Sequence, residues 1–180
     1  NVTIGGSAAG ARNVISGNTG HGILIAGGSG HFVQGNYIGT DVTGSIDLGN
    51  DLHGIVVSNA GSNLIGGTSA AERNVISGNN AYGIAIAGAS STGNTVSGNY
   101  VGLDAAGTAA IGNVFGVDIE GGATANTIGG LTPAARNVIS GNTNSGVLVQ
   151  FAGTSGNQVI GNYIGTDASG SAPVANLLSG

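Results

Sequence analysis

The 180-residue chain contains no cysteine, methionine, tryptophan or lysine, and only two prolines. Without cysteine, disulfide frameworks, zinc fingers and thiol catalysis are excluded, and without lysine so are P-loop phosphate binding and Schiff-base chemistry. The only arginines are Arg12, Arg73 and Arg136, against eight acidic residues and a net charge of −5. Because the chain lacks the basic patch that phosphates require, nucleic acid is not expected as a partner.

Charge and aromatic residues are also scarce, at 6% and 4% of the chain, whereas hydrophobic residues make up 40% and glycine occupies 38 positions. Disordered chains combine low hydrophobicity with high net charge, so this composition predicts a folded chain. No run of 18 apolar residues occurs, and no charged segment followed by an apolar one opens the sequence. We therefore expect neither membrane insertion nor a targeting signal within these residues.

What the chain does contain is a long repeat. The letters RNVISGN occur three times, at residues 12–18, 73–79 and 136–142. A second set of letters, GNYIGTD or GNYVGLD, occurs at residues 35–41, 98–104 and 161–167. Three super-repeats of about 62 residues therefore cover the chain, approximately 1–61, 62–124 and 125–180. We expect a single β-solenoid segment whose ends, which fall in mid-pattern, meet further turns of a longer chain or fibre.

A shorter period lies within each super-repeat. A glycine followed by an alternating apolar triplet recurs every 29 to 33 residues, at Gly22, Gly54, Gly83, Gly116 and Gly146. One structural turn is therefore about 31 residues long, and two slightly different turns make one super-repeat. The middle position of the triplet holds Leu24, Val56, Ala85, Asp118 and Leu148. Because this position accepts a carboxylate, we expect it to face water while the flanking aliphatic residues face inward.

Each turn holds two further strand-like runs. One of them places an inward aliphatic residue at Ile4, Val33, Ile65, Val96, Ile128 and Val159. In the later turns an asparagine precedes that residue by two positions, at Asn63, Asn94, Asn126 and Asn157. The other run begins with an asparagine in every turn, at Asn13, Asn36, Asn74, Asn99, Asn137 and Asn162. The residue that follows this asparagine, which is Tyr37, Tyr100 or Tyr163 in alternate turns, is expected on the outer face.

These patterns exclude the main alternatives to a parallel coil. Apolar residues do not recur with the period of a helix, and glycines are too frequent for one. No Asn-Gly or Asp-Gly pair is present to form tight hairpins. We predict an all-β fold: a right-handed parallel β-helix with three strands per turn and about six turns, the hand following from the preference of parallel crossovers. Identical residues then stack about 4.8 Å apart, and inward asparagines form hydrogen-bonded ladders, whereas columns of like charge would repel.

Acidic residues form two candidate sites. Asp118 and Glu120 lie two positions apart on one strand, where they are either a catalytic carboxylate pair or a solvated face, and we favour the solvated face. Other aspartates follow the third strand in alternate turns, at Asp41, Asp104 and Asp167. Asp47 and Asp51 lie in the loop that begins at Asp41. They are either calcium ligands or turn caps. Because each insert holds too few carboxylates for a calcium site, we favour turn caps. No catalytic, cofactor or metal residue is therefore assigned.

The arginines, histidines and tyrosines also admit two interpretations each. The three arginines precede the third strand, where they either contact an anion or carbohydrate, or bridge backbone carbonyls or an acid such as Glu72. His21, His31 and His53 show no common period and are interpreted as ordinary surface or corner residues. The outward tyrosines either stack on sugars or pack within the protein, and we favour packing.

The combination IGG-x5-RNVISGN and GNYIGTD-x2-G resembles the pectate-lyase-like type of β-helix repeat found in large bacterial extracellular and cell-surface proteins. The resemblance covers residues 1–180. It implies a β-helix in an extracellular or surface-attached protein, on a scaffold that also carries lyases, hydrolases, tailspikes, adhesins and spacers.

An enzyme must break its repeat at the active site, whereas these units differ mostly by exchanges among small residues. We therefore expect a non-catalytic rod, stalk or fibre segment, as in an adhesin or extracellular filament, that needs no cofactor. Its expected partners are further repeats or copies end to end, and a surface or extracellular polysaccharide is a further candidate. The alternative is a carbohydrate-active module: a polysaccharide lyase, a glycoside hydrolase or a sugar-binding domain.

Overall fold

A computed structural model describes residues 1–8 and 10–180 as a stack of β-strands in three parallel sheets. Sheet A contains β1 (Thr3–Gly5), β4 (Phe32–Gln34), β7 (Leu64–Gly66), β10 (Thr95–Ser97), β13 (Thr127–Gly129) and β16 (Gln158–Ile160). Sheet B contains β2 (Val14–Ile15), β5 (Tyr37–Ile38), β8 (Val75–Ile76), β11 (Tyr100–Val101), β14 (Val138–Ile139) and β17 (Tyr163–Ile164). Sheet C contains β3 (Ile23–Ala26), β6 (Ile55–Ser58), β9 (Tyr82–Ala87), β12 (Phe115–Glu120) and β15 (Val147–Val149).

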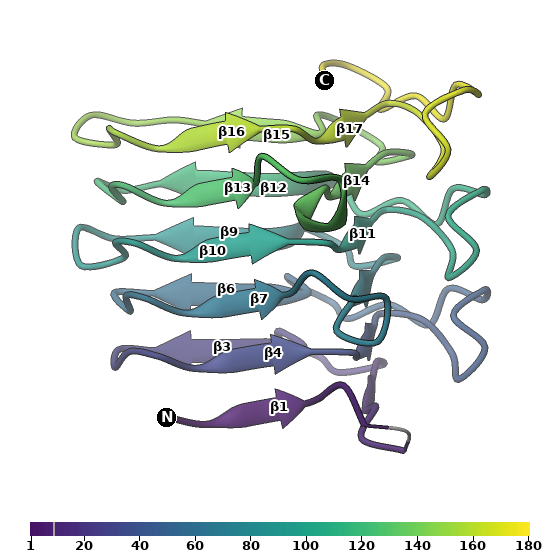
Figure 1. Ribbon diagram of the computed structural model, residues 1–180, viewed down its shortest axis with the longest axis horizontal. Helices are drawn as coiled ribbons and strands as arrows, with labels where there is room; N and C mark the ends of the chain where they lie inside the picture. The colour runs from purple at the N-terminus through teal and green to yellow at the C-terminus, as the bar shows by residue number, and fades with distance from the viewer. Residues whose placement is uncertain (9) are drawn as a thin grey trace.

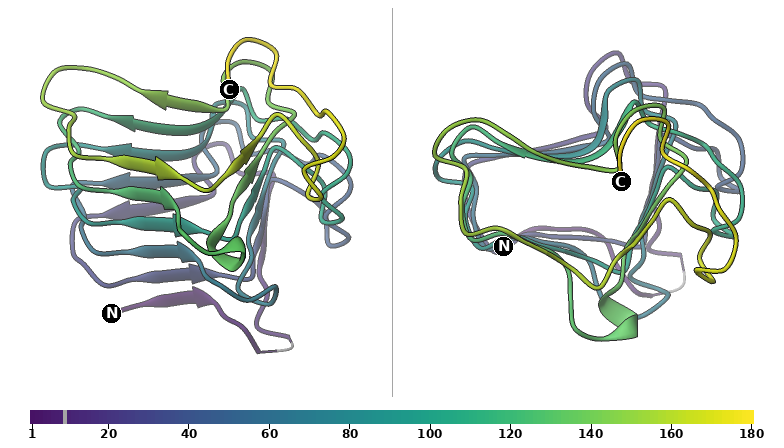
Figure 2. Two further views of the ribbon diagram at one scale, coloured as in Figure 1. Left: turned by 45° about the horizontal axis from the view of Figure 1, so that its top comes forward. Right: turned by 90° about the horizontal axis from the view of Figure 1, so that it is seen from above.

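The chain passes through sheets A, B and C in turn, which confirms the predicted β-solenoid with three strands per turn. It completes five turns and adds two strands of a sixth, where about six turns were expected. The front strands in Figure 1 run to the right and the rear strands to the left as the chain rises from its N-terminus, and Figure 2 shows the same path from above. This path is a right-handed coil.

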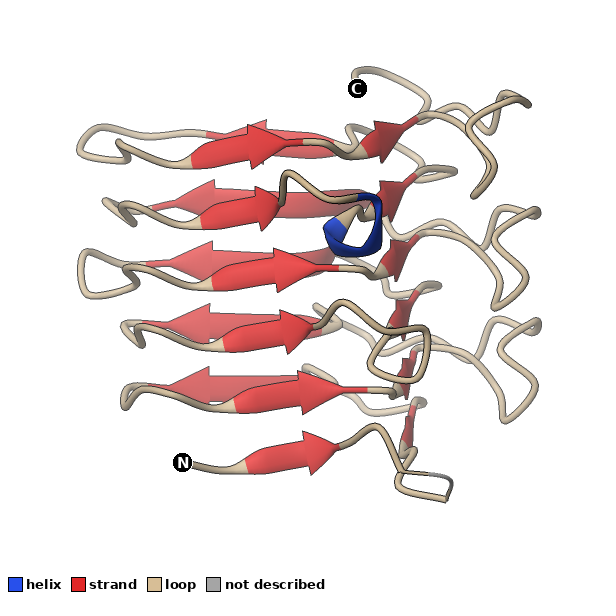
Figure 3. Cartoon of the chain, viewed as in Figure 1, coloured by secondary structure: helices blue, strands red, loops and turns tan. Residues whose placement is uncertain are grey.

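Two kinds of insert interrupt the turns. One kind joins sheets A and B, and its third copy contains the only helix in the described ranges, the 3₁₀ helix η1 (Pro133–Ala135). The other kind follows sheet B and forms the loops that project to the right of the sheets in Figure 3. No helix among the described residues is long and apolar enough to cross a membrane.

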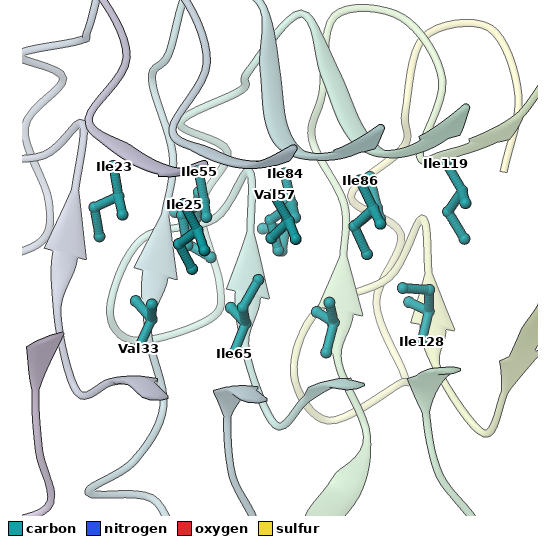
Figure 4. Close-up of a cluster of buried hydrophobic side chains, with 14 of the residues drawn as sticks. Ile23, Ile25, Val33, Ile55, Val57, Ile65, Ile84, Ile86, Ile119 and Ile128 are labelled. Carbon is teal, nitrogen blue, oxygen red and sulfur yellow. The ribbon is translucent and has the colours of Figure 1, made fainter. Parts of the chain in front are cut away.

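The core consists of stacked aliphatic columns, two from sheet C and one each from sheets A and B. Register pairs such as Val33 with Ile65 and Ile55 with Ile84 place equivalent residues directly above one another. Figure 4 shows the isoleucines of sheet C facing Val33, Ile65 and Ile128 of sheet A. Most of these side chains are fully buried, so the predicted inward aliphatic columns are confirmed.

Asparagine ladders run along all three corners of the solenoid. Two follow the predicted columns: Asn13, Asn36, Asn74, Asn99, Asn137 and Asn162 between sheets A and B, and Asn63, Asn94, Asn126 and Asn157 between sheets C and A. The third, between sheets B and C, was not predicted: Asn18, Asn50, Asn79, Asn113, Asn142 and Asn176. Its members lie 29 to 34 residues apart, about one turn of the solenoid, so the spacing of this ladder was present in the sequence.

Glycine is needed where the chain turns a corner against the next turn. Gly66 has φ of +88°, and a Cβ there would collide with the carbonyl oxygen of Ser97 and the side chain of Asn99. Gly54 has no room either, since its Cβ would lie 2.7 Å from Ile76. The glycine columns therefore reflect both a left-handed backbone and close stacking of neighbouring turns.

One sequence prediction about sheet C is wrong. The middle position of the apolar triplet was expected to face water, and Leu24 at the first turn is indeed 56% exposed. Val56, Ala85 and Asp118 are instead buried, at 8%, 3% and 0% exposure. They lie on the outer face of the sheet, and Gln150 of the next turn lies over Asp118, as described next.

Candidate functional site

The outer face of sheet C carries one polar cluster that breaks the repeat. Asp118 of β12 is flanked by Ala85 of β9 and Leu148 of β15, so the acid replaces an aliphatic residue of the column. Gln150, just after β15, donates its side-chain amide to Oδ1 of Asp118 at 3.1 Å and to Glu120 at 3.4 Å. Oδ2 of Asp118 is buried and has no hydrogen-bond partner among the residues that the structure describes.

Burial controls the protonation of this cluster. Desolvation is the main cause that raises the pKa of Asp118 to about 7, and the negative charge of Glu120 and a hydrogen bond with Glu120 also raise it. The hydrogen bond from Gln150 acts to lower this pKa. Burial also raises the pKa of Tyr82 on β9, and the charge of Asp118 adds to that effect. The expectation of a solvated face for Asp118 is therefore wrong: a carboxyl group that exchanges its proton near neutral pH lies beneath Gln150.

An aromatic column lies at the start of the strands of sheet C. His21 stacks on His53, His53 on Tyr82, and Tyr82 on Phe115, with ring centroids 4.8, 5.0 and 5.0 Å apart. The prediction that the histidines share no period is thus wrong for His21 and His53, which lie 32 residues apart, one turn of the solenoid. The signal was present, because both immediately precede the glycine that opens the apolar triplet. His31 lies elsewhere, where its Nδ1 accepts the backbone N–H of Val2 at 3.2 Å.

The arginines and outward tyrosines form three equivalent clasps between successive turns. The guanidinium carbon lies over the tyrosine ring of the next turn, at 4.0 Å for Arg12 and Tyr37. Arg73 on Tyr100 and Arg136 on Tyr163 repeat this contact at 4.2 and 3.9 Å. In each copy the arginine Nε also donates to a carbonyl oxygen, that of Gly35, Gly98 or Gly161.

Both clasp residues are therefore engaged within the protein. The predicted bridge from arginine to backbone carbonyl is confirmed, as is the intramolecular packing of the tyrosines. The expected contact of an arginine with Glu72 does not form, because Glu72 accepts the backbone N–H groups of Thr68 and Ser69. The contact of each guanidinium with a tyrosine was not predicted, since the two residues lie 25 or 27 positions apart in sequence.

The aspartates after sheet B cap the inserts. Oδ1 of Asp41 accepts the backbone N–H groups of Ser45 and Ile46 at 3.1 and 3.0 Å, and the Thr43 hydroxyl binds the same carboxylate at 2.8 Å. Desolvation acts to raise the pKa of Asp41, but these hydrogen bonds prevail and lower it to about 2. Equivalent backbone bonds reach Asp104 and Asp167. The predicted role as turn caps is confirmed for these three residues.

The calcium alternative gains no support from side-chain placement. Asp47 accepts the N–H of Gly49 within its own insert at 3.0 Å, and Asp51 contributes its backbone N–H to Asn18. Across residues 1–8 and 10–180, no group of three or more histidine, aspartate or glutamate side chains is placed to hold a metal ion.

The fold and these contacts define the protein as a parallel β-solenoid with asparagine ladders. Comparison with protein-family models, with curated proteins and with solved structures gives no match to the chain. Function must therefore be argued from the geometry of its own residues.

Proposed function

We propose that the chain is a non-catalytic structural rod, stalk or fibre segment of a secreted or surface-attached bacterial protein. The observation that carries this proposal is the continuity of the asparagine ladders, which pass through successive turns at all three corners. In a solenoid each repeat contacts only its neighbours, so the fold lengthens along one axis as turns are added, which is the geometry of a rod. The bacterial surface location is supported by the sequence resemblance alone.

The ladders also have a direction. Asn74 donates its side-chain amide to Oδ1 of Asn99 at 2.9 Å, and Asn99 donates in turn to Asn137 at 3.1 Å. Side chains in the other two ladders donate the same way, toward the next turn along the chain. A further turn, from the same protein or from another copy, therefore continues the ladders only in a head-to-tail arrangement. This polarity supports end-to-end partners of the same fold.

The rod proposal can be tested by stretching single molecules between tags at the two termini. A load-bearing solenoid should resist force and then lengthen in steps that correspond to whole turns. Lengthening of the whole chain in a single event at low force would contradict the proposal. A matched screen for turnover of acidic and neutral polysaccharides should give none, and turnover that disappears in Asp118→Asn would overturn the non-catalytic role.

A second candidate, a carbohydrate-active module, is favoured by one observation. Asp118 breaks the repeat, is fully buried, and its Oδ2, beside Glu120, has no hydrogen-bond partner among the described residues. A carboxyl group that titrates near neutral pH is suited to general acid–base catalysis, and a second carboxylate beside it is the usual companion in sugar cleavage. In the same screen, Asp104→Asn is the matched control, because Asp104 caps an insert and does not contact this cluster.

A further inference from the structure

The first two inserts between sheets A and B close with the same backbone hydrogen bond but carry different side chains. The turn is closed by a hydrogen bond from Ala11 N to Ala8 O in the first insert and from Glu72 N to Ser69 O in the second, at 3.0 and 3.1 Å. Alignment on the following arginine makes Ala11 the equivalent of Glu72, and Ser7 and Ala8 the equivalents of Thr68 and Ser69. The inserts can therefore be compared position by position.

In the second insert this turn binds a carboxylate. Oε2 of Glu72 accepts the backbone N–H groups of Thr68 and Ser69 at 3.1 and 2.9 Å, and the hydroxyl of Ser69 at 2.9 Å. The pKa of Glu72 is lowered, first by the hydroxyl of Ser69 and then by its backbone N–H. Two consecutive backbone N–H groups that converge on one oxygen form an anion-binding concavity.

In the first insert the same concavity lacks its acid. Ala11 ends at Cβ, and the N–H groups of Ser7 and Ala8 hold no hydrogen bond within the described part of the chain. A Cβ added to Gly67 would lie 2.5 Å from the carboxylate of Glu72, whereas one added to Gly6 would meet, among the described residues, only Ala11, at 3.6 Å. The space that Glu72 fills in the second insert is therefore open in the first.

This open space is a pocket with a fixed positive charge. Its volume is about 470 Å³, and it is lined by Gly6, Ser7, Ala8, Gly10, Arg12, Gly35 and Ala71. The guanidinium of Arg12 is held in place by Tyr37 and by the carbonyl oxygen of Gly35. That hydrogen bond uses Nε alone, so the other guanidinium nitrogens keep their donor capacity.

We propose that the first insert is a binding site for a carboxylate group of an external ligand, held by the N–H groups of Ser7 and Ala8 with Arg12 beside them. The carboxylate of Glu72 shows how the two N–H groups bind an oxygen, and the hydroxyl that Ser69 adds there has no counterpart at Ala8, where Arg12 supplies the charge. The site lies at the corner between sheets A and B and is independent of the Asp118 cluster. It gives the rod a lateral attachment point for an acidic ligand in addition to its contacts along the axis.

The test is a titration of the ¹⁵N-labelled chain with sodium acetate at constant ionic strength, followed by amide chemical shifts. Saturable shifts are expected at Ser7 and Ala8 and not at Thr68 and Ser69, which Glu72 already occupies. Acetamide, which has the same shape but no charge, should produce no saturable shift. Absence of an acetate response at Ser7 and Ala8 overturns the proposal, as does a response to sulfate without one to acetate.

Two substitutions exchange the sites. Ala11→Glu should fill the first pocket from within and abolish its acetate response, whereas Glu72→Ala should create an acetate response at Thr68 and Ser69. Ala11→Glu should be more stable than the wild type, and this gain should be lost as acid protonates the new carboxylate. The matched variant Ala11→Gln controls for the size of the side chain, and its stability should not show this pH dependence. A Glu72→Ala chain that folds but shows no acetate response at Thr68 and Ser69 contradicts the proposed mode of binding.

Discussion

The imidazole rings of His21 and His53 stack across neighbouring turns, with centroids 4.8 Å apart and an angle of 14° between their planes. The contact is built on the neutral form of both rings. Nδ1 of His21 accepts the backbone N–H of His53 at 3.4 Å, and Nδ1 of His53 accepts that of Tyr82 at 3.2 Å. Protonation at Nδ1 removes the acceptor, and protonation of both rings places two positive charges face to face.

Acid should therefore weaken the solenoid through this stack. Burial lowers the pKa of His53 below its ordinary 6.5, and the charge of His21 lowers it further. The unfolded chain thus takes up the proton first, so the contribution of His53 to stability is complete above pH 6.5 and is lost as the pH falls through its folded pKa. Urea unfolding at a series of pH values should show this loss.

A pair of variants checks the assignment. His53→Phe continues the aromatic column toward Tyr82 and Phe115 and should remove most of the acid-dependent loss. His31→Gln changes a histidine outside the stack and should retain it. Equal pH dependence in both variants would mean that the stack is not the source.

Asp118 should affect stability with a pH dependence opposite to that of His53, and the variant Asp118→Asn tests this. Burial raises the pKa of Asp118 to about 7, so the folded chain binds a proton that the unfolded chain releases near pH 4. Stability from this group is present in acid and is lost as the pH rises through about 7. An uncharged amide avoids that loss, so the variant should gain roughly 1–2 kcal/mol near pH 8, the shift being discounted for solvent screening.

The measurement is the free energy of unfolding at about pH 5 and pH 8 for both proteins. The gain should be larger at pH 8 than at pH 5, because the loss accumulates between the unfolded pKa near 4 and the folded pKa of about 7. Asp104→Asn is the control, because Asp104 is an insert cap that accepts two backbone N–H groups and its loss can only weaken the insert. A gain of the same size in the control would assign the effect to net charge rather than to burial.

The repeat made the fold predictable, because a column of identical residues in sequence becomes a column in space. Ile65 and Asn99, for example, occupy the positions that their periods predict. Asp118 was misplaced because the alternation of a strand separates inner from outer faces but does not show what covers the outer one. That cover comes from Gln150, 32 residues later, whose role no local pattern indicates.

Removal of one clasp should cost a small and predictable amount. Arg73→Ala removes both the contact with the ring of Tyr100 and the hydrogen bond to the carbonyl of Gly98. A cation–π contact contributes about 0.5–2 kcal/mol, so the loss should be of that order. Arg73→Lys keeps the charge but lacks Nε, so its stability should lie between those of the wild type and Arg73→Ala. Thermal unfolding of the three proteins gives the order, and a Lys variant as stable as the wild type would show that the hydrogen bond contributes nothing.

The largest effect of these substitutions is expected in the ladder between sheets A and B. Asn99 is fully buried and accepts at Oδ1 both the side-chain and the backbone N–H of Asn74, at 2.9 and 3.2 Å. Its own side chain donates to the carbonyl of Ile65 at 2.9 Å and to Asn137 at 3.1 Å. Asn99→Leu, although similar in size, leaves these donors and acceptors buried without partners.

The expected loss is about 1–3 kcal/mol, the cost of leaving buried polar groups unsatisfied. Asn80→Leu is the matched control, since Asn80 is an exposed asparagine one position beyond the ladder residue Asn79, and it should change stability by less than about 0.5 kcal/mol. Chemical unfolding measures both. Hydrogen exchange adds a local test, because the N–H of Asn74 loses its acceptor and should exchange faster in Asn99→Leu. Equal stability of the two variants would mean that the ladder follows the fold without stabilising it.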